Sequence, residues 1–595
     1  MSHRLAAACV AAAAFAAFGA PTPAVAAPAP FGHSCTPQGP ARFCPAADLA
    51  QRAPSWDGTP IDVDVTLPAT GDGPFPTILL LHGVGGTKTM FEATDPAANA
   101  GYNNLALAAR GYAVVTPTAR GYGGSCGKPE SRTPDCAAGY TYLGDERYEV
   151  RDGQALLGEL VDEGVAMPNR IGVTGVSYGG GFSTMSAYLR DRVRLPDGRY
   201  APWVSPKGTP LRFAAAYARW PWSSGAAIFA RNGRDIWSQT PVGVVAGSYL
   251  GAIFGVPKAL AWVAPQGTPN YAADLLTWEA ASEEGRDTPA VRKALQNAFD
   301  YHGVAGTTGT PAPILLESGW TDNLFPVAQS LAVYDRVRKA DPKAPVQLQV
   351  GDIGHARGTN HPEDVRRTVA GGLAWLDYYL LNKGPAPQAG KVTAFLQTCP
   401  KTTPSSGEPV VAGSFAALAR GSFTLSGAAT KTQTVTSTGG DVALGEAVDP
   451  LGKVGGDACA TYDTVTSPNT AVLTRRSPGL TLLGLPVVRA KVVTKGANGQ
   501  LIGRLWDVDP ATGKQRLIMP GAYRLTPNQR GTIAWKLDGN GYRFAAGHTI
   551  RLEIVGRSAP TYANAPNAFS AKLSGLSVTL PTRDAPSRAK GIAAP

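Results

Sequence analysis

The feature that most constrains this chain is a serine between two glycines, in the segment Gly-Val-Ser-Tyr-Gly at residues 175–179. β-branched side chains at 170–174 predict a strand before the segment, and residues 181–189 have helical character. A sharp turn between a strand and a helix strains the serine backbone and leaves no room for side chains beside it, hence the flanking glycines. The helix N-terminus would then offer the N–H of Tyr178 to a developing anion next to Ser177.

The Gly-x-Ser-x-Gly pattern alone is weak, because 70 glycines occur in 595 residues and chance would give a match in roughly half of such chains. A second match lies at residues 123–127. It follows a predicted strand at 112–115 but runs into Lys128-Pro129-Glu130, which cannot start a regular helix at the serine. The context therefore selects Ser177 as the candidate nucleophile, and we interpret the second match as a glycine-rich loop.

The N-terminus is typical of a secretory signal peptide over residues 1–26. Arg4 is a minimal basic region, an apolar stretch follows, and small residues precede Ala27 as a cleavage site. We expect a secreted, extracellular protein, with an uncleaved anchor as the alternative. No integral membrane segment is expected after cleavage, because the most membrane-like internal stretch, 242–256, is short and is closed by a Pro-Lys pair.

The cysteines indicate disulfide bonds. Removal of residues 1–26 leaves six cysteines, an even number that in an oxidising compartment indicates three disulfides among fifteen possible connectivities. No Cys-x-x-Cys or Cys/His cluster occurs, so we expect no metal, and the sequence indicates no cofactor. The simplest pairing joins sequence neighbours: Cys35 with Cys44, Cys126 with Cys136, and Cys399 with Cys459.

The charge distribution gives no indication of nucleic-acid binding. The formal net charge is +11, but it is spread over the whole chain with no dense run of Lys and Arg. The sequence leaves the oligomeric state open.

The central part of the chain predicts an α/β fold. Residues 61–67 alternate between apolar and polar side chains, and residues 76–81 form the apolar run expected of a parallel strand buried on both faces. Over residues 59–390 such strands alternate with helices, which predicts a doubly wound sheet. The alternation stops between about 192 and 308, a stretch with six tryptophans that we interpret as a cap over the site.

The two flanking regions differ from this pattern. Residues 27–58 are rich in Pro and Ala and contain two cysteines, which indicates an extended arm that is tied down. Residues 391–582 contain short alternating runs separated by turn residues, which predicts an all-β domain, most simply a two-sheet sandwich. The last segment, 583–595, is predicted to be a flexible tail.

Two further residues complete a candidate catalytic set. A serine hydroxyl needs a base to take its proton, and the base needs a partner that fixes its tautomer. In α/β-hydrolases the acid and then the base follow the serine along the chain. His355 lies in the loop after the last predicted sheet strand, and Asp322 ends the strand before it. Glu317 and Asp352 are alternatives for the acid, but Asp352 is so near in sequence that its geometry toward His355 would be awkward.

The loop after the strand at 76–81 reads His-Gly-Val-Gly-Gly at 82–86. In α/β-hydrolases this loop supplies a second hydrogen-bond donor to the oxyanion. The backbone N–H of Val84 or Gly85 is therefore the candidate, together with that of Tyr178.

Several motifs resemble one known family. These are the segments 175–180, Gly-Trp-Thr-Asp at 319–322 and Gly-His at 354–355, followed by Leu-Trp-Asp-Val at 505–508 and by residues 546–552 in the all-β region. Together they resemble the X-Pro dipeptidyl-peptidase and cocaine-esterase family over nearly all of the mature chain.

The resemblance implies an α/β-hydrolase fold with a helical cap and a C-terminal jelly-roll domain. It also implies a triad of Ser177, Asp322 and His355, and cleavage of esters or of dipeptides ending in Pro. Cocaine-esterase-like members use a tyrosine side chain after the third strand as an oxyanion donor, whereas residues 82–87 here contain no tyrosine. A backbone donor is therefore expected in its place.

The leading hypothesis is thus a secreted serine hydrolase that cleaves an ester or amide through an acyl-enzyme, similar to X-Pro dipeptidyl-peptidases. A carboxylesterase acting on small or lipophilic acyl esters is the alternative. A hypothesis of another class is an inactive hydrolase core that binds cell wall or carbohydrate. A peptidase would need acidic residues for the free amine of its substrate, and those in the predicted cap are Asp274, Glu279, Glu283 and Glu284.

Overall fold

The computed structural model describes residues 1, 28–254, 270–273, 275, 287–405, 407–428 and 431–584. The predicted signal peptide therefore lies outside the described residues except for its first residue, as does the tail from 585. The same holds for the four cap acids that could bind an amine, Asp274, Glu279, Glu283 and Glu284. No helix in the described ranges is long and apolar enough to cross a membrane.

An eleven-stranded sheet forms the centre of the molecule, in the order β1-β2-β5-β7-β6-β8-β11-β14-β15-β16-β17. Its strands from β7 to β16 are parallel to one another, which confirms the predicted doubly wound α/β sheet. In chain order the strands are β1 (Thr36–Gln38), β2 (Ala41–Cys44), β5 (Val63–Pro68), β6 (Phe75–Leu81), β7 (Ala113–Pro117), β8 (Ala166–Val176), β11 (Phe213–Arg219), β14 (Ile314–Gly319), β15 (Val346–Gly351), β16 (Val392–Ala394) and β17 (Val410–Ala412).

Helices cover both faces of this sheet. One hydrophobic core contains Val150, Met185 and Leu331 from α2 (Glu149–Asp162), α3 (Tyr178–Leu189) and α8 (Val327–Ala340). The other contains Leu105 and Val369 from α1 (Asn104–Ala109) and α9 (Pro362–Leu376), and α9 continues into a π-helical turn, η7 (Asp377–Leu381). The large buried apolar side chains on both faces account for the parallel sheet, because such sheets need cover on both sides.

The sheet corrects the predicted start of the cap. Strand β11 lies inside the range 192–308 and pairs with β8 on one side and β14 on the other. Its sequence, Phe-Ala-Ala-Ala-Tyr-Ala-Arg, has few of the side chains that favour strands. The sequence pattern therefore predicts no strand there, and the alternation of strands and helices ends too early in the prediction. The inserted elements begin after β11 and include α4 (Gly225–Phe229), β12 (Ala230–Arg231), β13 (Val244–Val245), α5 (Gly247–Phe254) and α7 (Pro289–Tyr301).

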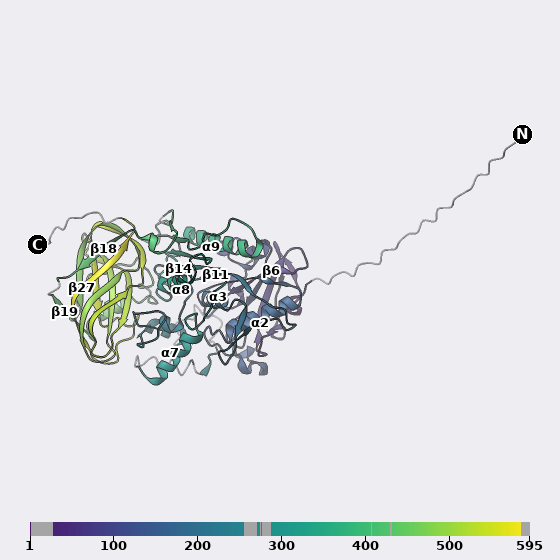
Figure 1. The fold of residues 1–595 in the computed structure, drawn as a ribbon, viewed down its shortest axis with the longest axis horizontal. Helices are drawn as coiled ribbons and strands as arrows, with labels where there is room; N and C mark the ends of the chain where they lie inside the picture. The colour runs from purple at the N-terminus through teal and green to yellow at the C-terminus, as the bar shows by residue number, and fades with distance from the viewer. Residues whose placement is uncertain are drawn as a thin grey trace.

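The C-terminal region is an antiparallel all-β domain with its own hydrophobic core, as predicted for a β-sandwich. Figure 1 shows it (yellow and green) at one end of the α/β domain. Strands β16 and β17, which lie after the predicted boundary at 391, pair within the central sheet. The strands of the sandwich are β18 (Gly421–Ser426), β19 (Thr432–Thr436), β20 (Tyr462–Asp463), β21 (Ala471–Gly484), β22 (Val487–Lys495), β23 (Gln500–Val508), β24 (Lys514–Arg524), β25 (Arg530–Lys536), β26 (Asn540–Val555) and β27 (Ser570–Thr582).

All three predicted disulfide pairs are present. Cys35–Cys44 closes the hairpin β1–β2, which extends one edge of the central sheet and forms part of the N-terminal arm. Cys126–Cys136 closes the glycine-rich loop that contains the second Gly-x-Ser-x-Gly match. Cys399–Cys459 joins the segment after β16 to the loop before β20, and so links the central sheet to the sandwich.

The disulfides differ in the length of chain that they close, which predicts an order of stability losses. Replacing Cys399 and Cys459 by Ser removes a cross-link between residues 60 positions apart. In the chain-entropy model this should lower the free energy of unfolding by about 4 kcal/mol. The matched pair, Cys35 and Cys44, spans 9 residues and should cost about 2.5 kcal/mol. Urea unfolding of the two double variants measures both, and a larger loss for the shorter closure would contradict this explanation.

Candidate active site

Ser177 lies at the turn between β8 and α3, as the sequence predicts. Its backbone has φ 58° and ψ −111°, a conformation that a side chain bears only under strain. A Cβ on Gly179 would lie 2.3 Å from the carbonyl oxygen of Leu81, and one on Gly175 would lie 2.7 Å from the same oxygen. Only glycine fits at either position, so the turn is the strained elbow expected around a serine nucleophile.

Three strands of the sheet bring Ser177, Asp322 and His355 together, because their carboxyl ends meet at one edge. His355 Nδ1 lies 2.6 Å from Asp322 Oδ2, and His355 Nε2 lies 2.6 Å from Ser177 Oγ. Since the carboxylate accepts, Nδ1 carries the proton and donates it, which leaves Nε2 to accept from the serine hydroxyl. This arrangement can move a proton from Ser177 to His355 while Asp322 holds the ring.

Asp322 is fixed on all sides. Its Oδ1 accepts hydrogen bonds from the backbone N–H groups of Leu324 and Phe325, and its Oδ2 also accepts from the N–H of His355.

The two alternative acids, Glu317 and Asp352, bind other side chains. Glu317 pairs with Arg219 within the sheet, and Asp352 accepts from Thr321 Oγ1 and lies 3.9 Å from His361. The structure thus pairs His355 with Asp322.

Two of the predicted oxyanion donors, Tyr178 and Val84, line the same cavity as Ser177. Tyr178 is the first residue of α3, so its N–H has no acceptor within the helix. Val84 and Ser177 line the same cavity, whereas Gly85 does not line it. Of the two predicted loop donors, the N–H of Val84 is therefore the better placed.

His82, which sequence reasoning did not single out, fastens the loop that carries Val84. The N–H of Ala119 donates to His82 Nε2 at 2.9 Å, so Nδ1 is protonated and donates to the carbonyl of Gly83 at 2.7 Å. The carbonyl of His82 accepts from the N–H of Gly179. Burial lowers the pKa of His82 to about 4, so the ring is neutral at ordinary pH and keeps both bonds.

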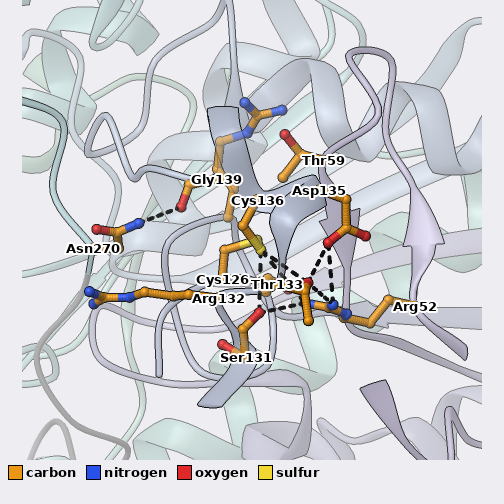
Figure 2. The surroundings of a disulfide bond; sticks show 12 residues. Arg52, Thr59, Cys126, Ser131, Arg132, Thr133, Asp135, Cys136, Gly139 and Asn270 are labelled. Carbon is orange, nitrogen blue, oxygen red and sulfur yellow. Dashed lines mark hydrogen bonds and ion pairs between the residues drawn. A yellow bond between two sulfur atoms is a disulfide. The ribbon is translucent and has the colours of Figure 1, made fainter. Parts of the chain in front are cut away.

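Figure 2 shows the disulfide Cys126–Cys136, which closes the glycine-rich loop, and the residues around it. Arg52 donates to the carbonyl of Ser131 and to Thr133 Oγ1, and Asn270 of the inserted segment donates to the carbonyl of Gly139 at 3.1 Å. The loop leads to Thr141, whose hydroxyl lies 3.2 Å from that of Tyr178. The segment directly after the disulfide loop, residues 139–141, therefore contacts both the inserted segment and the residue after the nucleophile.

A small, largely apolar cavity of about 50 Å³ opens at Ser177 and His355. Apart from these two residues its polar side chains are Tyr178, Tyr249 and His302, and none of its lining residues in the described part of the chain is acidic. Two tryptophans predicted in the cap region, Trp262 and Trp278, lie outside the described residues. The apolar walls come from the oxyanion loop, the segment before α2, the segment between β11 and α4, α4 and α5 themselves, and the loop after Asp322: Val84, Leu143, Trp222, Ile228, Phe229, Ile253, Leu324 and Phe325.

Buried acids lie behind this cavity. Asp145 lies 3.4 Å from His302, and Glu149 accepts from the N–H groups of Tyr142 and Asp145. Burial raises the pKa of Glu149 to about 7, with a smaller contribution from the charge of Asp145. Burial likewise raises the pKa of Glu146 to about 8, although Thr307 donates a hydrogen bond to its carboxylate. These side chains hold the segment 145–149 behind the pocket.

The raised pKa of Glu146 predicts a pH dependence of stability. Between pH 4.5 and about 8 the unfolded chain has lost a proton that the folded protein keeps, so the free energy of unfolding falls as pH rises. Glu146→Gln removes this titration, and thermal unfolding of the variant should depend less on pH across that window. The control is Glu363→Gln: this exposed carboxylate pairs with Arg366 and Arg367, whose hydrogen bonds lower its pKa, and should leave the slope unchanged. Equal slopes for Glu146→Gln and the wild type would contradict the assignment.

Two family models match the chain. The model for the X-Pro dipeptidyl-peptidase (S15 family) matches residues 57–193, and the model for the X-Pro dipeptidyl-peptidase C-terminal non-catalytic domain matches residues 380–578. The first range contains Ser177 and the second contains the sandwich. No curated protein sequence matches the chain.

Solved structures share the fold of almost the whole chain. An aminopeptidase from a marine sediment Thaumarchaeota archaeon has 15% identity and a TM-score of 0.56, covering 89% of this chain and 95% of its own. An α-amino acid ester hydrolase has 15% identity and a TM-score of 0.52, covering 89% and 96%. A CocE/NonD family hydrolase from Staphylococcus aureus has 13% identity and a TM-score of 0.57, covering 91% and 94%.

The two family models cover the start of the catalytic domain and the sandwich, together more than half of the 595 residues, and in the same order as in the predicted family. The resemblance inferred from the sequence motifs is thereby confirmed. The chain belongs to the X-Pro dipeptidyl-peptidase (S15) family of serine hydrolases.

Proposed function

We propose that Ser177, His355 and Asp322 form a catalytic triad that cleaves an ester or amide through an acyl-enzyme, in an exported protein. The observation that carries this proposal is the continuous pair of hydrogen bonds from Ser177 Oγ to His355 Nε2 and from His355 Nδ1 to Asp322. The strained turn at Ser177 and the position of the Tyr178 N–H at the start of α3 support the same chemistry.

The mechanism follows from these contacts. His355 takes the proton of Ser177 as the hydroxyl oxygen attacks the substrate carbonyl, and Asp322 stabilises the imidazolium that forms. The N–H groups of Tyr178 and Val84 hold the oxyanion, each worth about 10²–10³ in rate. His355 then protonates the leaving group, the acyl group stays on Ser177, and a water activated by His355 releases it.

The cavity supports a compact apolar acyl group as the substrate class. A volume of about 50 Å³ between Trp222, Ile228 and Phe325 fits a proline ring or a few carbon atoms, and burying them there is favourable. An Xaa-Pro dipeptidyl amide, with the proline carbonyl attacked by Ser177, is our leading substrate class. The match to the S15 family model supports this choice.

A short acyl ester is the second candidate. A dipeptide carries a free ammonium group that needs a negative partner, and no acidic side chain of the described residues lines the cavity. An uncharged acyl group needs no such partner, so the apolar walls favour an ester.

We also propose that the protein acts outside the cytoplasm. Residues 1–26 are typical of a secretory signal, and three disulfides are consistent with an oxidising compartment.

The triad predicts covalent labelling at one serine. A fluorophosphonate probe should label Ser177, and Ser177→Ala should abolish both labelling and hydrolysis. Asp322→Asn should lower kcat about 10⁴-fold, because the amide no longer holds His355 in the required tautomer. Ser125→Ala in the second Gly-x-Ser-x-Gly match is the control and should still be labelled. Labelling that persists in Ser177→Ala would mean that another residue is the nucleophile.

The two substrate classes are separated by a paired assay. Turnover of an Ala-Pro chromogenic amide and of a butyryl ester should be measured on one preparation, with N-acetyl-Ala-Pro amide as the matched substrate without an ammonium group. A peptidase should prefer the free amine, and an esterase should prefer the butyryl ester. Activity on none of the three would contradict the proposed acyl group.

A further inference from the structure

We propose that Arg231 and Asp538 act together as a positioning pair for Asp322, so that the β-sandwich supplies part of the machinery of the hydrolysis proposed above. The inference rests on that proposed function. It assigns a role to two residues that lie outside the triad and the oxyanion loop.

Arg231 connects the sandwich to the loop that carries Asp322. The residue ends β12, and its side chain is largely buried. Its Nη1 donates to both carboxylate oxygens of Asp538, at 2.9 and 2.8 Å. Its Nη2 donates to the backbone carbonyl of Asn323 at 2.8 Å, one residue after Asp322. One guanidinium therefore ties the acid loop to a carboxylate of the other domain.

The turn around Asp538 packs directly against this loop. Asp538 lies between β25 and β26, and its N–H donates to the carbonyl of Pro520. A Cβ on Gly539 would lie 3.1 Å from Val327, and one on Gly541 would lie 2.8 Å from Trp320 Nε1. Both contacts lie within the segment 320–327, so the glycines of the turn allow the backbone of the sandwich to approach the acid loop closely.

The pair also balances charge next to the triad. Asp322 Oδ1 and Oδ2 are already used by two backbone N–H groups and by His355. Without Asp538, the positive charge of Arg231 would act on Asp322 and His355 uncompensated. A positive charge there disfavours the protonated imidazolium that forms during the reaction.

The pKa directions are consistent with this proximity. Burial opposes the charge of Arg231, but Asp538 and, more weakly, Tyr562 and Asp322 outweigh it and raise the pKa of the guanidinium. Burial raises the pKa of Asp538, while Arg231 and Arg357 oppose that rise. Asp322 contacts His355, and the titratable side chains of Tyr178, Tyr249 and His302 line the same cavity as His355. Arg231 and Asp538 interact electrostatically with Asp322, while Arg357 and Tyr562 interact with Asp538.

A double-mutant cycle tests the proposal through the acidic limb of kcat/KM, which reports protonation of the general base. Asp538→Asn leaves Arg231 uncompensated and should shift that limb to lower pH by about half a unit to one unit. Adding Arg231→Met to Asp538→Asn should return the limb to within about 0.2 unit of the wild type. In that double variant kcat should remain about 10- to 100-fold below the wild-type value with KM little changed, because the loop that carries Asp322 has lost its hydrogen bond to Arg231.

Two further variants separate positioning from folding. Arg231→Lys keeps the positive charge but cannot make all three hydrogen bonds, two to Asp538 and one to the carbonyl of Asn323. It should therefore lower kcat and leave the acidic limb of the kcat/KM profile at the wild-type pH. Arg234→Met is the matched control, since Arg234 contacts the sandwich at Arg524 and Gln529 away from the triad, and kcat and the limb should stay as in the wild type.

The outcomes distinguish this inference from the proposed function. Absence of fluorophosphonate labelling in the wild type would overturn the proposed function. Normal labelling with an unmoved limb in Asp538→Asn, or a loss of kcat in Arg231→Lys no larger than in Arg234→Met, would overturn the positioning pair alone. If Arg231→Met does not fold, Asp538→Asn and Arg231→Lys decide by these same two criteria.

Discussion

Strand β6 and helix α3 approach each other so closely at the active centre that a single added carbon would not fit. A Cβ on Gly179 would lie 2.3 Å from the carbonyl of Leu81, and Ser177 is held at φ 58° between these two elements. Such a backbone conformation costs about 1–3 kcal/mol, which the packed sheet around it must supply. Because Leu81 is followed by His82, whose carbonyl accepts from Gly179, the same contact sets the position of the oxyanion loop. The contact between β6 and α3 therefore positions both the nucleophile and the N–H groups that are expected to bind the oxyanion.

The parts of the site that follow chain order could be predicted from the sequence, and the parts that depend on long-range contacts could not. Ser177 and His355 each follow a recognisable apolar strand, so the carboxyl edge of a parallel sheet brings them together. Strand β11 was missed because its alanines do not favour a strand, although the sheet buries them between β8 and β14. No local pattern indicates that His82 would fasten the oxyanion loop, or that β16 would join the central sheet rather than the sandwich. These contacts are fixed by tertiary packing, which single-residue propensities do not describe.

The contact between the two domains combines apolar packing, in which Val244 lies against side chains of the sandwich, with the buried ion pair of Arg231 and Asp538. Removing Arg231 and Asp538 from water costs several kcal/mol for each ion, and a buried pair often gives little net stability. A stability role alone therefore explains the pair poorly. Its geometry explains it better, since the guanidinium donates to Asp538 and to the carbonyl of Asn323 at once, and so leaves the carboxylate of Asp322 to His355. In this interpretation the sandwich is part of the active centre and not an appended module.

The acids behind the cavity bear on the choice between a peptide and an ester substrate. Asp145 lies near His302, whereas Glu149 accepts from backbone N–H groups and Glu146 from Thr307. Burial raises the pKa of Glu146 to about 8 and that of Glu149 to about 7, so at neutral pH Glu146 is mostly protonated and Glu149 about half protonated, and both are mostly neutral in weakly acidic solution. They are therefore poor partners for the ammonium group of a dipeptide. If the enzyme is a dipeptidyl-peptidase, the negative charge must come from elsewhere, and the acids at 274–284 are the candidates that the sequence offers. The substrate class then depends on a few residues of the inserted segment, while the triad and its supports serve either reaction.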